Sequence, residues 1–197
     1  MKVIVGVSVR HAHLTKEIYE RLFGNDKLEK MVDIDQPGQF SSTSVITIKN
    51  GDRKIENVRI VGPLRDYNQI EISRTDCYKL KVDPPIRTSG EIEGSLPITV
   101  VGPKGEVNLD EGLILANRHV HINPSDVKKY GLEGISKVAI KITGEKTGIL
   151  ENVYLKVQDT AALRLHLDTD DANAFNLKTG DEVELLKIKR WYDGVKR

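Results

Sequence analysis

The chain has 197 residues, which is enough for one compact unit with a sizeable core or for two small barrels. Its 30 Lys and Arg residues nearly balance 29 Asp and Glu residues, and the net charge of +1 argues against general binding to nucleic acid or to an anionic membrane. The only cysteine, Cys77, excludes an internal disulfide and a thiolate zinc cage, so a metal would need nitrogen or oxygen ligands.

The N-terminus leads straight into an alternating apolar run, Lys2–Arg10. It has no charged leader followed by an apolar segment, and the chain has no apolar stretch of about 18 residues. We therefore expect a cytoplasmic protein that neither enters nor crosses a membrane.

Short segments with a period of two, rich in Val and Ile, recur along the chain and are typical of β-strands. In chain order they are Val3–Val9, Val45–Lys49, Asn57–Val61, Gln69–Ser73, Leu96–Val101, Lys137–Ile142, Asn152–Val157, Leu163–Leu167 and Glu182–Ile188. A helical pattern is confined to short pieces such as Lys16–Leu22 and Pro124–Tyr130. The pattern predicts a mostly β fold of the barrel or sandwich class, with Asp83–Gly94 as an internal linker and 190–197 as a loose tail.

An internal repeat relates the two halves of the chain. Arg10-His11-Ala12-His13-Leu14 returns as Arg118-His119-Val120-His121-Ile122, and Ile55-Glu56-Asn57-Val58 returns as Leu150-Glu151-Asn152-Val153. Extending the second match places Glu71 and His166 at equivalent positions.

Each candidate ligand at the end of a strand is followed by an apolar residue and then by a helix-capping residue. The four examples are His13-Leu14-Thr15, Glu71-Ile72-Ser73, His121-Ile122-Asn123 and His166-Leu167-Asp168. Thr, Ser, Asn and Asp accept hydrogen bonds from the first turn of a helix. We therefore expect each ligand to end a strand just before a short helix, where side chains converge at a barrel mouth.

Residues i and i+2 of a strand point to one face, so each HxH offers two imidazoles to the same side. Adding Glu71 to His11 and His13, and His166 to His119 and His121, gives two sets of three ligands with positions open for water or substrate, as in catalytic zinc sites. A single HxH is better explained by a solvated or hydrogen-bonded pair than by a metal site. Two copies of HxH, each with a third ligand at an equivalent position, favour a metal site over that explanation.

Two other metal-dependent classes share part of this pattern. His11-x-His13-x₃-Glu17 matches half of a cupin motif, but Glu17 falls in a predicted helix and no second cupin motif follows. Hydrolases on (β/α)₈ barrels need about 250 residues and alternating helices. A cupin-like oxygenase or isomerase stays an alternative, as does a non-catalytic interaction module stapled by zinc.

Arg65 lies six residues before Glu71, and a guanidinium can bind phosphate with two parallel hydrogen bonds. The alternative for Arg65 is a surface ion pair with Asp66. Cys77 could be considered as a nucleophile, but it has no histidine nearby in sequence and is better explained as a buried filler.

With these residues assembled, the chain resembles the propanediol-utilisation type of phosphate acyltransferase, the phosphate propanoyltransferase family. The matching segments, in order, are Val5–Leu14, Gln36–Phe40, Gly62–Ser73, Asn117–His121 and His166–Asn173. The loop Lys27–Asp35 matches the family poorly.

The resemblance implies one catalytic unit, 1–197, made of two β-barrels with two zinc ions and coenzyme A between them. One barrel would combine about 1–13 with about 119–190, and the other would span about 30–118. The implied reaction transfers a short acyl group reversibly between acyl-CoA, either acetyl-CoA or propanoyl-CoA, and inorganic phosphate, by direct attack of phosphate on the thioester.

The resemblance also implies roles for individual residues. His11, His13 and Glu71 would bind one zinc; His119, His121 and His166 would bind the other; Arg65 would hold phosphate; and Val7, Ser8, Val9, Arg59 and Asn173 would contact coenzyme A. A homodimer is implied, and an acetate or propionate kinase is a candidate partner in the same pathway. Members of bacterial microcompartments resemble this chain but carry an N-terminal extension, so the cytoplasm is expected and the microcompartment lumen is the alternative.

Overall fold

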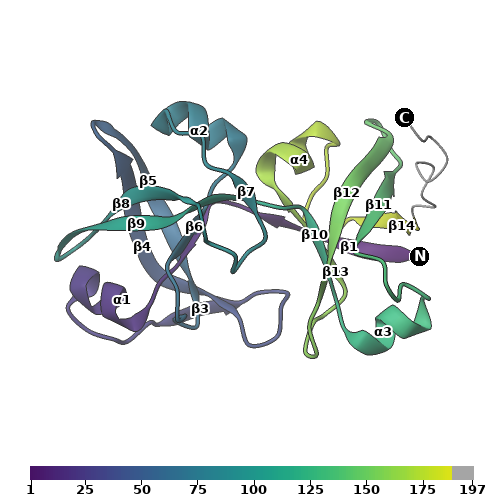
Figure 1. The fold of residues 1–197 in the computed structure, drawn as a ribbon, viewed down its shortest axis with the longest axis horizontal. Coiled ribbons are helices and arrows are strands. Elements are labelled where there is room, and N and C mark those ends of the chain that lie inside the picture. Colours follow the sequence, from purple (N-terminus) through teal and green to yellow (C-terminus); the bar gives the residue numbers. More distant parts are fainter. Residues whose placement is uncertain (188–197) are drawn as a thin grey trace. The chain divides into compact units, whose positions relative to one another are not determined.

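The computed structural model describes residues 1–187, so the loose tail expected at 190–197 lies outside the described residues. The described residues divide into two compact units, one formed by Met1–Val7, Arg118–Leu167 and 171–187, the other by Ser8–Asn117 and Asp168–Asp170. Each unit is built around its own closed ring of β-strands (Figure 1). The prediction of a mostly β fold with two small barrels is therefore confirmed.

The first barrel is a ring of six strands. Around the ring these are β1 (Lys2–Ser8), β13 (Arg164–Asp168), β10 (His119–Ile122), β12 (Gly148–Val157), β11 (Lys137–Ile142) and β14 (Glu182–Leu186). Its interior is filled by apolar side chains such as Val5, Val120 and Leu165, all fully buried.

The second barrel closes in the same way, because β8 pairs with both β4 and β9. Its ring consists of β4 (Phe40–Asn50), β5 (Arg53–Gly62), β2 (His11–His13), β6 (Gln69–Glu71), β9 (Gly105–Ala116) and β8 (Leu96–Gly102). Two short strands extend its sheet, β3 (Lys30–Asp33) and β7 (Ile86–Arg87). Its core includes Ile60, Ile70 and Leu113.

Residues 1–187 contain four helices, all of them short, as the sequence predicts. They are α1 (Lys16–Phe23), α2 (Arg74–Leu80), α3 (Pro124–Lys129) and α4 (Thr169–Ala174). Thr15, Ser73 and Asn123 cap the first three of these helices, each accepting a hydrogen bond from a backbone N–H of the first turn. Each helix follows the strand that carries a candidate ligand.

The sequence repeat is also a repeat of strand pairing. β2 runs parallel to β5 and antiparallel to β6, while β10 runs parallel to β12 and antiparallel to β13. The register is the same in both halves, since His11 lies opposite Glu71 and His119 lies opposite His166.

The strand that precedes each HxH strand belongs to the other barrel. β1 joins the first barrel and β2 the second, whereas β9 joins the second barrel and β10 the first. The expectation that residues 1–13 lie together in the first barrel is therefore wrong for His11–His13. The chain leaves its alternating run at Ser8, so the two pieces pair with different partners.

Three strands were not predicted from the sequence: β3, β7 and β9. In the longest, β9, Gly112 interrupts the alternation of apolar residues and has a φ of 123°. A Cβ atom there would lie 2.5 Å from the backbone oxygen of Asn68, so the close approach of these two backbone segments requires glycine. The expected linker Asp83–Gly94 instead contains β7, which pairs with β9 inside the second unit.

Candidate metal centres

Both HxH strands use their two faces for different purposes. Ala12 and Leu14 point into the core of the second barrel, and Val120 and Ile122 point into that of the first. Because successive side chains of a strand alternate, the four histidines face away from the barrel interiors. The ligands therefore lie on the outer wall of each barrel, and not at a barrel mouth as the sequence suggested.

The first triad joins His11, His13 and Glu71, whose ligand atoms lie within 4.8 Å of one another. Nε2 of His11 is 3.6 Å from Oε2 of Glu71. The Nδ1 atoms of His11 and His13 lie 2.9 and 3.2 Å from the carbonyl oxygens of Val9 and Val61. A carbonyl can only accept, so in the neutral form of each ring Nδ1 carries the proton and Nε2 presents a lone pair, the form that binds a metal.

Burial is the main reason that His13 stays neutral. The pKa of His13 is lowered to about 3, mainly by burial and also by the nearby His11 and Arg65, against the opposing charge of Glu71. An imidazole that does not compete for protons at neutral pH is suited to metal binding.

Gln69 holds the carboxylate of the first triad. Its side-chain amide is fully buried and donates to Oε1 of Glu71 at 2.6 Å and to Oγ of Ser89 at 2.9 Å. Its oxygen accepts from the backbone N–H of Gly90 at 2.8 Å. One carboxylate oxygen is thereby fixed while the other faces His11.

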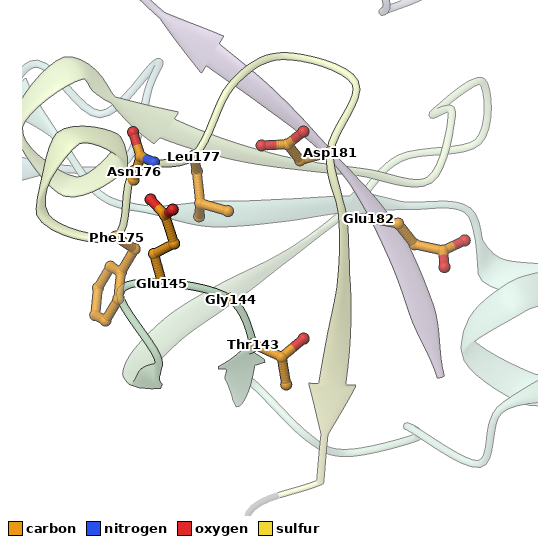
Figure 2. Close-up of a pocket in the computed structure, with 8 residues that line it drawn as sticks. All are labelled: Thr143, Gly144, Glu145, Phe175, Asn176, Leu177, Asp181 and Glu182. Atoms are coloured by element: carbon orange, nitrogen blue, oxygen red, sulfur yellow. The ribbon is translucent and has the colours of Figure 1, made fainter.

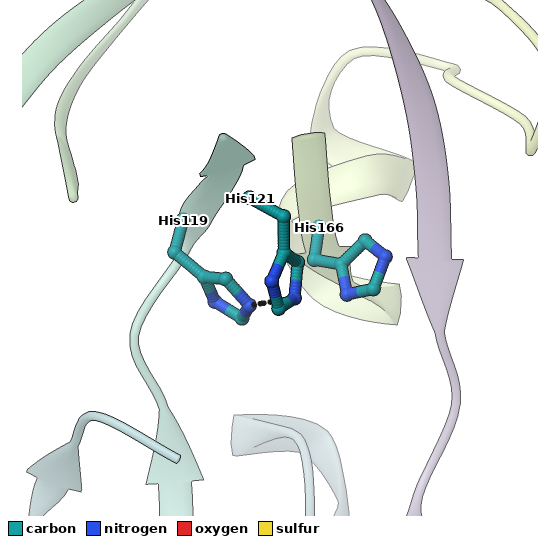
Figure 3. Close-up of side chains that lie close together, drawn as sticks. All are labelled: His119, His121 and His166. Carbon is teal, nitrogen blue, oxygen red and sulfur yellow. Dashed lines mark hydrogen bonds between the residues drawn. The ribbon is translucent and has the colours of Figure 1, made fainter. Parts of the chain in front are cut away.

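The second triad joins His119, His121 and His166, again with ligand atoms within 4.8 Å of one another (Figure 3). The Nε2 atoms of His119 and His121 are 3.0 Å apart. Two imidazoles around a tetrahedral zinc with bonds of about 2.0 Å would place their nitrogens roughly 3.3 Å apart. A shared hydrogen bond also explains a pair at this distance, but the third imidazole gives the group the composition of a ligand set.

An acceptor also orients the second triad. Nδ1 of His121 lies 3.1 Å from Oε1 of Gln158, so Nε2 is turned toward the other two histidines. Sequence reasoning missed both Gln69 and Gln158. Gln69 could have been found, because it lies two residues before Glu71 and so shares its face of the strand.

Arg65 is tied to the end of the first HxH strand. Its backbone N–H donates to the oxygen of Leu14 at 2.9 Å. Within residues 1–187 its Nε atom is buried without a hydrogen-bond partner, and no ion pair joins Arg65 to Asp66. A buried guanidinium nitrogen lacking an acceptor is the group that an anionic ligand would satisfy.

Cys77 is buried on α2, and its thiol donates to the backbone oxygen of Ser73 at 3.3 Å. Burial raises the pKa of the thiol, which disfavours the reactive thiolate. The structure therefore supports the interpretation of Cys77 as a buried filler.

The residues expected to contact coenzyme A are distributed over both units. Val7 and Asn173 belong to the first unit, while Ser8, Val9 and Arg59 belong to the second. Arg59 is the cross-strand neighbour of His11, and its guanidinium donates to the oxygen of Ser42 at 2.7 Å. Their role in binding coenzyme A stays a prediction.

A surface hollow of about 320 Å³ in the first unit contains none of the triad residues (Figure 2). Its lining includes the carboxylates of Glu145, Asp181 and Glu182. Three acids would repel the phosphate groups of coenzyme A, the expected substrate, so this hollow is a poor candidate for its binding site.

Comparison with known proteins gives a consistent match. The family model described as phosphate propanoyltransferase matches residues 4–178. A phosphate propanoyltransferase of Thermotoga maritima is 43% identical over 189 residues, covering 94% of this chain and 90% of its own. One of Lachnoclostridium phytofermentans is 45% identical, covering 93% and 87%, and one of Citrobacter freundii is 39% identical, covering 86% and 81%. No helix among the described residues is long and apolar enough to cross a membrane.

Proposed function

Since the chain belongs to the phosphate propanoyltransferase family, we propose that it transfers acetyl or propanoyl groups between coenzyme A and inorganic phosphate with the help of two zinc ions. The observation that carries the proposal is the pair of three-donor triads. Three nitrogen and oxygen ligands with open positions are typical of catalytic zinc. His11, His13 and Glu71 would hold one ion, and His119, His121 and His166 the other.

Arg65 would hold the phosphate. The planar fork of its guanidinium can donate two parallel hydrogen bonds to phosphate oxygens. A phosphate fixed in this way keeps one oxygen directed at the thioester, which lowers the entropic barrier to attack.

The reaction would be a direct transfer. A phosphate oxygen forms a bond to the thioester carbonyl carbon, and the C–S bond then breaks with its electron pair leaving on sulfur. Zinc, when bound, would supply positive charge for the developing oxyanion and for the departing thiolate. Cys77 is buried and its thiol is held protonated, so it does not offer itself as a covalent carrier.

The test is phosphate-dependent release of free thiol from acetyl-CoA and from propanoyl-CoA by the purified, zinc-loaded protein. We expect release with at least one of them, formation of the matching acyl phosphate, and about two zinc ions per chain. No release with zinc bound would remove the proposal, and a comparison of kcat/KM for the two substrates would define the acyl preference.

The two alternatives are less well supported. Glu17, which a cupin site would need, lies on α1 and belongs to neither triad. A structural zinc module would need four protein ligands, whereas each triad among the described residues has three.

The proposal extends to assembly and substrate contacts. We propose a homodimer, contacts of Val7, Ser8, Val9, Arg59 and Asn173 with coenzyme A, and an acetate or propionate kinase as pathway partner. Light scattering after size-exclusion chromatography tests the dimer, for which a mass of one chain would be the contrary result.

A further inference from the structure

The same charged pair recurs beside each triad. Arg10 immediately precedes His11, and its guanidinium donates through Nε to both oxygens of Asp76, at 3.0 and 2.9 Å, with Nη2 at 2.8 Å. In the other half Arg118 immediately precedes His119, and its Nη1 lies 3.6 Å from Oδ1 of Asp171. Both acids lie on the first turn of a helix, five residues after the third ligand.

In the first half this carboxylate is also part of the helix cap. Oδ2 of Asp76 accepts from the backbone N–H of Ser73 at 3.4 Å, and Oγ of Ser73 accepts from the N–H of Asp76 at 3.3 Å. Ser73 follows Glu71 by two residues. Asp76 therefore links the start of β2, which carries two ligands, to the end of β6, which carries the third.

Neighbouring antiparallel strands can shift against each other at their ends, and a shift here would separate the two histidines from Glu71. The start of β2 and the end of β6 are adjacent because the two strands run antiparallel. A bidentate guanidinium–carboxylate pair at that point resists sliding in both directions, since its geometry is fixed in a plane.

We propose that Arg10 and Asp76 form a strap that positions the first triad for metal binding, and that Arg118 and Asp171 form an equivalent, looser strap for the second. The proposal rests on the proposed function in that it takes both triads to bind zinc. Arg10, Asp76, Arg118 and Asp171 act through the backbone of the ligand strands and are positioning residues.

The two straps differ in strength. The side chain of Asp76 is only 5% exposed and lies 2.8–3.0 Å from the guanidinium of Arg10, whereas Arg118 and Asp171 are 33% and 30% exposed and lie 3.6 Å apart. A buried carboxylate that loses its partner is left uncompensated, whereas an exposed one is solvated by water. Removing Arg10 should therefore disturb its triad more than removing Arg118 disturbs the other.

The experiment measures zinc affinity by competition with a chelator, one site at a time. Arg10→Gln is made in a full-length chain whose second triad is disabled by His121→Ala, and Arg118→Gln in one whose first triad is disabled by His13→Ala. Thermal unfolding of each metal-free variant is recorded in parallel. If Arg10→Gln does not fold, the same measurement is made on Arg10→Lys, which keeps the charge but not the planar guanidinium.

We expect Arg10→Gln to weaken zinc binding at the first triad about tenfold, near the lower end of the effects seen when residues that orient ligands are lost. Arg118→Gln should weaken the second triad by a smaller factor. Asp76→Asn should match Arg10→Gln, and the double variant should be little worse than either single one.

A strap that only stabilises the fold would give another result. Arg10→Gln would then lower the melting temperature of the metal-free chain while leaving zinc affinity within about twofold of the parent. That outcome would overturn the strap and leave the proposed function intact. If the unmodified chain bound zinc at neither triad, both the strap and the proposed function would be overturned.

Discussion

Gln69 shows at the scale of one residue how a neutral side chain can control a ligand. Its side chain is fully buried, and one of its hydrogen bonds fixes an oxygen of Glu71. Gln69→Leu would leave that oxygen and the N–H of Gly90 without this partner, at a cost of about 1–3 kcal/mol in the free energy of unfolding. We also expect zinc affinity at the first triad to fall roughly 10–100-fold.

Chelator competition and urea unfolding together check this prediction. Gln158→Leu is the matched control in the other half, because Gln158 also orients a ligand but is exposed. Water can replace the contact of Gln158 with His121, so Gln158→Leu should lower zinc affinity and stability less than Gln69→Leu does. Equal effects of the two variants would contradict the argument from burial.

Arg65 carries a second prediction at this scale. Arg65→Lys keeps the charge but loses the fork, so the KM for phosphate should rise roughly tenfold, equivalent to one charge-assisted hydrogen bond of about 1.5 kcal/mol. The KM for acyl-CoA should change little. Arg21→Lys, at an exposed position on α1, is the control, and an unaltered phosphate KM for Arg65→Lys would exclude the assigned role.

Among the elements, β5 and β12 share an irregularity that explains the repeated Glu-Asn. Asn57 and Asn152 have φ values of 59° and 55°, and the register of each strand with its neighbour shifts at that point. This is a β-bulge in which one residue adopts the left-handed conformation, which Asn tolerates better than most residues. The repeat in the sequence thus marks a repeated backbone feature.

Asn57→Ala should lower the free energy of unfolding by about 1 kcal/mol, because alanine is strained at positive φ. Asn57→Gly should be nearly neutral, since glycine adopts this conformation without strain. Urea unfolding of both variants, and of the same pair at Asn152, provides the measurement. If Asn57→Ala and Asn57→Gly had the same free energy of unfolding, the bulge would have relaxed to ordinary strand geometry.

For the whole molecule, much of the fold follows from local signals. Alternating Val and Ile runs and the capping residues predict most strands and all four helices. Period-two patterns cannot predict β9, because Gly112 interrupts the alternation of apolar residues and is required by the close approach of Asn68. The sequence also does not reveal that β1 and β2 belong to different barrels, or that β9 and β10 do. Strand pairing is decided by tertiary contacts.

The candidate site shows the same division between local and distant information. Equivalent positions in the two halves were enough to group all six ligands, and the structure brings each group within 4.8 Å. The face on which they lie, and the partners Gln158 and Asp76, come from pairings between segments that are distant in the sequence. Spacing predicts the ligands of such a site better than it predicts what holds them in place.

Each barrel has its own apolar core, and this leads to a prediction about metal removal. The two clusters contain fully buried Ile60 and Leu113 in one barrel and Val120 and Leu165 in the other, so neither depends on a bound ion for its interior. A chelator should therefore abolish acyl transfer while far-ultraviolet circular dichroism keeps its β signal, and added zinc should restore activity. A small metal-dependent domain would instead unfold when the ion is removed. Loss of the β signal together with activity would favour the structural zinc module over the enzyme, and a dialysed sample without chelator controls for slow unfolding.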